Sequence, residues 1–124
     1  MIAVWHGHHN VLISWLESME ARLADIRDNK PEHELPTRER LMKPVAGSLP
    51  DELRIAWEAY SIAREAVRST GQTYGSMWEA DETARQAYDA IYAKHLPEIE
   101  VLHAAECPDC PWDGTSIFPA KEAR

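Results

Sequence analysis

A histidine and two cysteines lie close together in HAAECPDCPWDG, residues 103–114. His103 precedes Cys107 by four residues, and two residues separate Cys107 from Cys110. A cysteine pair at this spacing is half of a common structural zinc site. If the preceding helix runs to about residue 105, the imidazole lies on the same side as the first thiolate. We therefore predict that His103, Cys107 and Cys110 ligate a structural zinc ion.

A closed structural zinc site needs a fourth ligand, and the sequence leaves it open. In an up-down-up bundle, the end of the third helix lies near the end of the first, which favours His33. If the chain instead folds back at Pro97, the cysteines approach the N-terminal segment WHGHH. That segment offers three alternative fourth ligands: His6, His8 and His9.

Two other interpretations of the cysteine pair compete with a metal site. The first is a redox pair, but such a pair opens a helix, where the positive end of the dipole lowers the thiol pKa. Cys107 and Cys110 instead follow a helical pattern, at its negative end. The second is a pair of free thiols that only pack at the end of a helix. A mixed Cys/His ligand set does not separate zinc from iron.

Three long helices are predicted to position these residues. The first covers Asn10–Asn29, because apolar residues from Leu12 to Ile26 recur at intervals of four and three, and this stripe extends back to Trp5. The second begins after Ser48 and closes in the glycine-bearing turn STGQTYGS. The third covers residues 76–106 and continues, kinked, through Pro97, because its apolar register survives the proline.

These helices predict an all-α fold in one domain. The expected architecture is a single helical bundle over residues 1–124, on which residues 106–124 pack as a non-helical cysteine-containing knuckle and tail. No run of alternating β-branched residues predicts a sheet, apart from a short strand near 115–118. At 124 residues the chain is long enough for one core.

Charge and composition narrow the function classes. The net charge of −8 disfavours direct nucleic-acid binding and docking to an anionic membrane, which both need a cationic surface. It is compatible with a protein partner. Two cysteines and no secretory signal indicate a reducing compartment, and we expect the cytoplasm. The oligomeric state is not predicted.

Trp112 and Phe118 flank the cysteines and have two interpretations. They cover the end of the bundle and shield the metal, or they anchor a protein partner, since tryptophan is enriched at interface hot spots. We expect a non-enzymatic accessory protein, because no motif places a general base. The alternatives are a metal-dependent enzyme with an open water position and an acidic mimic of DNA.

Overall fold

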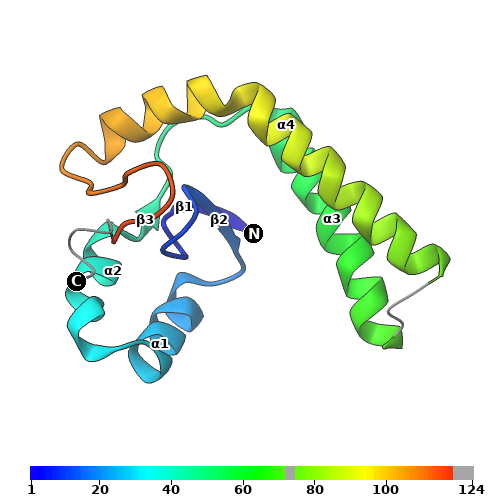
Figure 1. Cartoon of the computed structure of the whole chain (residues 1–124), viewed down its shortest axis with the longest axis horizontal. Helices are drawn as coiled ribbons and strands as arrows, with labels where there is room; N and C mark the ends of the chain where they lie inside the picture. Colours follow the sequence, from blue (N-terminus) through cyan, green and yellow to red (C-terminus); the bar gives the residue numbers. More distant parts are fainter. Residues whose placement is uncertain (72–74, 119–124) are drawn as a thin grey trace. The chain divides into compact units, whose positions relative to one another are not determined.

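The computed structural model describes residues 1–71 and 75–118, which belong to two compact units (Figure 1). Unit 1 consists of Met1–Gly47 together with the segment that begins at Leu102, and unit 2 is Ser48–Val101. Unit 1 thus combines two segments that are far apart along the chain. It contains both the N-terminal histidines and the two cysteines.

Unit 1 is built on a three-stranded antiparallel sheet with the order β2-β1-β3. The central strand β1 (Ile2–Trp5) pairs with β2 (Ile13–Leu16) on one side and with β3 (Lys43–Pro44) on the other. Val4 and Trp5 are neighbours in β1, so they point to opposite faces of the sheet. Both are 0% exposed, which shows that this end of β1 is covered on both faces.

The helices of unit 1 pack beside this sheet. Helix α1 (Met19–Asn29) begins after Ser18, whose hydroxyl accepts a hydrogen bond from the Ala21 amide at 3.1 Å. A 3₁₀ turn, η1 (Glu32–Glu34), leads into α2 (Leu35–Leu41). One buried cluster joins β1, α1 and the end of α2 through Val4, Ile26 and Met42. A second joins α2 to the C-terminal segment through Leu41, Cys107 and Ile117.

Unit 2 is a pair of antiparallel helices that lie side by side (Figure 1). Helix α3 (Asp51–Thr70) ends at Gly71, whose φ of 70° is a left-handed conformation that suits glycine. Helix α4 (Ser76–Glu106) follows and contains Pro97. The two helices contact each other through the rings of Trp57 and Tyr88, whose centroids are 5.2 Å apart. The last turn of α4, from Leu102, belongs to unit 1.

The prediction of an all-α bundle of three long helices is wrong. Residues 13–16, which we assigned to the first helix, form a strand, and Trp5, the limit of its backward extension, ends another strand; α1 begins only at Met19. The fold is therefore a mixed α/β fold with a three-stranded sheet. The short strand expected near residues 115–118 is absent from that segment.

Burial on both sides of the sheet explains the error. Strands with one solvated face alternate between apolar and polar residues, and that alternation is the signal for a strand. Ile13 and Ser14 are neighbours in β2, and both are buried, so alternation is lost there. Leu12 and Leu16 then match a helical spacing by coincidence. The other two long helices are present as α3 and α4, and α4 continues through Pro97 as one helix. Among the described residues, no helix is long and apolar enough to cross a membrane.

Candidate metal centre

Four side chains converge in unit 1 to form a candidate metal centre. His6 directly follows β1, His103 lies in the last turn of α4, and Cys107 and Cys110 lie in the turn after that helix. One ligand atom from each residue lies within 4.8 Å of all the others. Two imidazoles and two thiols are a donor set that can hold a metal ion, and they come from both ends of the described chain.

The backbone and the ring of His6 are both held in place. Its φ of 51° is left-handed, which is uncommon for a residue with a side chain. Its amide donates to the Leu12 carbonyl at 2.9 Å, and its Nδ1 lies 3.0 Å from the Val11 carbonyl oxygen. Because a carbonyl only accepts, Nδ1 carries the proton in this contact and Nε2 presents its lone pair. This tautomer is the one that ligates through Nε2.

Burial keeps His6 neutral. The side chain is 2% exposed, and burial lowers its pKa to about 4, with a smaller lowering from the nearby His103 and an opposing effect of the Val11 carbonyl. A neutral imidazole is the form that binds metal. His6 therefore needs no deprotonation to act as a ligand near neutral pH.

His103 faces His6 across the centre. The two Nε2 atoms are 2.9 Å apart, and the rings meet edge to face with centroids 5.0 Å apart. The His103 ring also packs against Trp5, at a centroid distance of 5.2 Å. Because His6 Nε2 is unprotonated, His103 Nε2 carries the proton in this contact, and a cation between the two atoms would replace that proton.

The turn after α4 presents the two thiols. The Cys107 amide donates to the His103 carbonyl at 2.7 Å, and the Cys110 amide donates to the Cys107 carbonyl at 3.2 Å. The Cys110 Sγ lies 3.2 Å from His6 Nε2. Tetrahedral zinc with bonds of about 2.0–2.3 Å would hold such atoms about 3.3–3.8 Å apart. Small outward shifts would therefore bring the closest pairs to the spacing of bound ligands.

The environment of the thiols opposes redox chemistry. Burial, together with the neighbouring Cys107, raises the pKa of Cys110 to about 11, although the Trp112 amide and Arg40 lower it. Reactive cysteine pairs need a lowered thiol pKa. A bound metal cation replaces the thiol proton and stabilises the thiolate directly. The raised pKa of Cys110 therefore argues against disulfide exchange, and the cluster can hold a metal ion.

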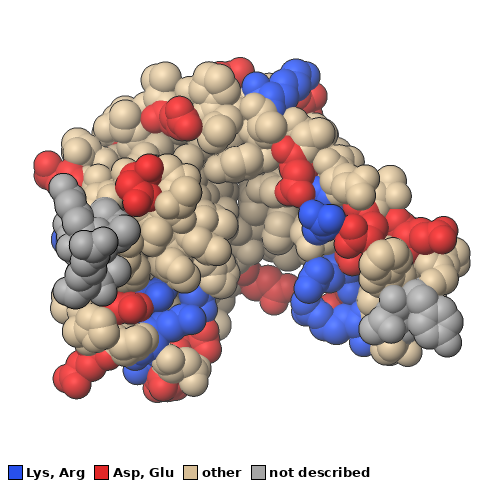
Figure 2. Space-filling view, in the orientation of Figure 1, with Lys and Arg blue, Asp and Glu red and all other residues tan. Residues whose placement is uncertain are grey.

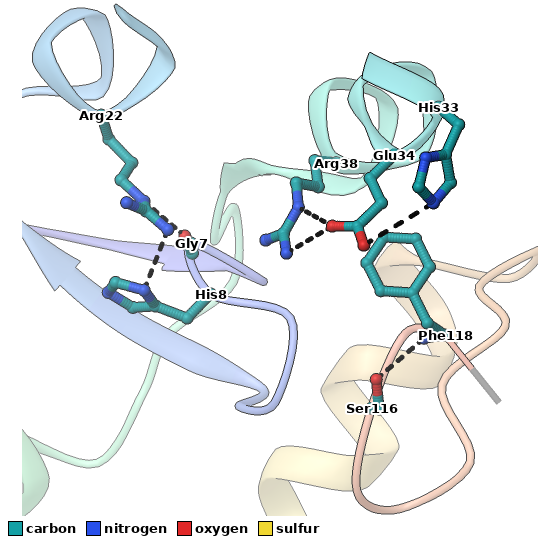
Figure 3. Close-up of polar contacts among 8 residues, drawn as sticks. All are labelled: Gly7, His8, Arg22, His33, Glu34, Arg38, Ser116 and Phe118. Carbon is teal, nitrogen blue, oxygen red and sulfur yellow. Dashed lines mark hydrogen bonds and ion pairs between the residues drawn. The ribbon is translucent and has the colours of Figure 1, made fainter. Parts of the chain in front are cut away.

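The loop that carries His6 is fixed from outside by α1. Arg22 donates from Nε to the Gly7 carbonyl at 2.7 Å and from Nη2 to His8 Nδ1 at 3.0 Å (Figure 3). Gly7 itself lies so close to β2 that a Cβ atom there would be 2.5 Å from the Ser14 Cβ. Only glycine fits at this position without a shift, so the loop conformation next to His6 is tightly determined.

The C-terminal segment covers the centre. The Trp112 ring lies against His6, with centroids 5.3 Å apart, and the Ile117 amide donates to the His9 carbonyl at 2.9 Å. Phe118 contacts the His9 ring, and the guanidinium of Arg38 lies 5.3 Å from the centre of the Phe118 ring. Trp112 and Phe118 are both half-buried, and of the two only Trp112 is shown in contact with a residue of the cluster. Their proposed role as partner anchors remains a prediction.

Three ligands of our preferred set, His103, Cys107 and Cys110, come together in the structure. The fourth member of the cluster is His6, which we gave as an alternative to His33. His33 lies on η1, its side chain 83% exposed, with Nε2 4.0 Å from a Glu34 carboxylate oxygen (Figure 3). It is outside the cluster. His8 and His9 are exposed on the loop after His6. The signal for His6 was present in the histidine-rich segment WHGHH, but the sequence did not predict the strand that positions it.

Comparison of the chain with protein-family models, with curated proteins and with solved structures found no match.

Proposed function

We propose that this protein binds one zinc ion through His6, His103, Cys107 and Cys110, and that the ion is structural. The observation that carries the proposal is the convergence of four donor atoms from two distant segments of the chain. Structural zinc sites have four protein ligands, whereas catalytic sites keep one position for water. A full Cys₂His₂ set therefore supports a structural role more than a catalytic one. Thiolate and imidazole donors together also suit zinc better than magnesium or calcium.

The burial of the ligands supports the same role. Three of them, His6, His103 and Cys107, are at most 8% exposed, and Trp112 lies over the His6 ring. A substrate would have to displace this cover to reach the metal. We therefore propose a non-enzymatic module that acts through its surface on a protein partner.

The distribution of charge bears on the DNA-mimic alternative. Figure 2 shows Asp and Glu side chains scattered over the visible face, with Lys and Arg side chains between them. A mimic of DNA would need carboxylates in a regular row, because it replaces the phosphates of the duplex. The visible face does not favour that alternative, so we do not propose it.

Metal analysis tests the proposed centre. Protein purified without a tag or added metal should contain one zinc per chain, and a strong chelator should lower the free energy of unfolding of unit 1, because the free energy of zinc binding also stabilises the folded state. Elemental analysis combined with native mass measures the content. Replacement of both cysteines, Cys107→Ser with Cys110→Ser, should abolish it. Zinc at one equivalent in that double variant would refute the site.

Cobalt substitution separates a structural from a catalytic centre. Co²⁺ in a closed tetrahedral Cys₂His₂ site should give strong visible absorption and a sulfur-to-metal charge-transfer band. These bands should not change on addition of azide or other small anions. A change in the bands would show an open coordination position and would favour the enzyme alternative.

A further inference from the structure

Glu106, the last residue of α4, takes part in four hydrogen bonds with residues that are distant along the chain. Its Oε1 accepts from the Trp5 indole N–H at 2.9 Å and from the Ala46 amide at 2.7 Å. Its Oε2 accepts from the Gly47 amide at 2.8 Å. The ammonium of Lys43 donates to its backbone carbonyl. One residue at the end of α4 is therefore bonded to β1, to β3 and to the segment after β3.

The positions of two of these residues connect the network to the metal centre. Trp5 directly precedes the ligand His6, and Glu106 directly precedes the ligand Cys107. Their side chains are bonded to each other, although they are 101 residues apart along the chain. The Trp5 ring also packs against the ring of His103. The Trp5–Glu106 hydrogen bond thus joins the two segments that supply the four ligands, at the residues next to His6 and Cys107.

Charge makes the acceptor strong. The two carboxylate oxygens of Glu106 accept hydrogen bonds from three N–H donors, and the ammonium of Lys43 is bonded to the same residue. Hydrogen bonds to a charged acceptor are about twice as strong as neutral ones. Gly47 allows the close approach, since a Cβ there would lie 2.5 Å from a Leu102 methyl carbon and 2.9 Å from Glu106 Oε2.

We propose that Glu106 is a positioning residue of the metal centre, which holds the N-terminal ligand His6 against the C-terminal ligands before the metal binds. This inference rests on the proposed zinc site. Its physical basis is preorganisation: a ligand set that is already assembled loses less conformational entropy when the ion arrives. Outer-shell partners of this kind typically change metal affinity by about 10- to 100-fold.

Two conservative variants test the proposal. Glu106→Gln keeps the shape but puts an amide N–H₂ where one of the three N–H donors needs an acceptor. Trp5→Phe keeps an aromatic ring against His103 but removes the indole donor. Each should weaken zinc binding by about 10- to 100-fold in competition with a chromophoric chelator. The control is Glu100→Gln, which removes the same charge from an exposed position on α4 and should leave the affinity unchanged.

A thermodynamic cycle separates positioning from general stabilisation. If Glu106 only stabilises the fold, Glu106→Gln lowers the free energy of unfolding equally with and without zinc, and the affinity stays at the wild-type value. If it positions the ligands, the zinc-bound form loses more. The variant that combines Glu106→Gln with Trp5→Phe should then lose less zinc affinity than the two single variants lose in sum, because both changes remove the same hydrogen bond.

The outcomes distinguish this inference from the proposed function. One zinc per chain, with reduced affinity in both variants, supports both. One zinc per chain with wild-type affinity in Glu106→Gln overturns the positioning role and leaves the zinc site intact. No zinc in the wild-type protein overturns both. The charge-transfer band of bound Co²⁺ should persist in the variants at saturating metal, which shows that the thiolate ligands are still bound.

Discussion

His6 has the properties of a buried ligand rather than of a surface histidine. It is 2% exposed, its Nδ1 is engaged by a backbone carbonyl, and its Nε2 faces His103 and Cys110. A left-handed φ costs free energy in a residue with a Cβ, and such strain is concentrated at functional sites. His33 has none of these features and is 83% exposed.

Replacement of these two histidines separates the two possible fourth ligands. His6→Ala should lower zinc affinity by more than about 100-fold, because it removes a ligand. Changes to residues that only contact a ligand typically lower metal affinity by about 10- to 100-fold. His33→Ala should leave the affinity at the wild-type value, because this side chain lies outside the cluster. Competition with a chromophoric chelator measures both. Equal weakening in the two variants would mean that the ligand set is wrong.

At the scale of elements, the pairing of α3 with α4 depends on charge as well as on packing. His95 on α4 is 14% exposed, its Nε2 is bonded to the Glu52 carboxylate on α3, and its Nδ1 lies 3.2 Å from Glu98 Oε1. Only the imidazolium form donates from both ring nitrogens. The hydrogen bond to Glu52 raises the pKa of His95, against the effect of burial, with further support from Glu98.

The His95–Glu52 pair predicts a pH-dependent stability. The pKa of Glu52 is lowered by its hydrogen bonds to Lys94 and His95, so this carboxylate is charged down to mildly acidic pH. Because the pKa of His95 is raised above 6.5, its contribution is full below pH 6.5 and is lost as pH rises through the raised pKa. His95→Gln should therefore destabilise the protein more at about pH 5.5 than at about pH 9.

Urea unfolding of the wild-type protein and of His95→Gln, both zinc-bound, measures this difference. Contributions of the metal ligands to the pH dependence are common to both proteins and cancel in the comparison. A difference in unfolding free energy that is the same at both pH values would contradict the ion pair. His33→Gln serves as the control, because it removes an exposed imidazole from unit 1.

At the scale of the whole molecule, an ion in the candidate metal centre would close a long loop. His6 and His103 are 97 residues apart along the chain, and their Nε2 atoms lie 2.9 Å apart. In the chain-entropy model, closing a loop of about 100 residues costs about 4–5 kcal/mol. Binding of structural zinc supplies about 10–16 kcal/mol in small zinc-binding peptides, enough to offset this cost. A zinc ion bound as we propose would therefore act as a cross-link between the two segments of unit 1.

Removal of the metal should affect the two units differently. The proposed cross-link lies within unit 1, whereas α3 and the part of α4 before Leu102 belong to unit 2 and contain none of the candidate ligands. Chelation should therefore accelerate amide hydrogen exchange in residues 1–47 and 102–118 much more than in residues 48–71 and 75–101. Mass spectrometry of peptides follows the exchange. Uniform acceleration over the described residues would show that the two units unfold together.

Local sequence determined the helices of unit 2 and the cysteine turn. The register of apolar residues predicted α3 and α4, and the glycines after residue 70 predicted the end of α3. The spacing of His103, Cys107 and Cys110 was sufficient to place three donors together, since a helix end and a short turn fix their geometry. These features depend on residues near one another along the chain.

Only the tertiary structure decided the sheet and the identity of the fourth donor. Strands β1 and β2 are stabilised by pairing within the sheet and by burial of both of its faces. Neither effect produces a periodic pattern of apolar residues in a segment of four residues. His6 reaches the cysteines because β1 is the central strand and because Trp5 and Glu106 join the two ends of the chain. Contacts between such distant residues are made only when the whole of unit 1 is assembled.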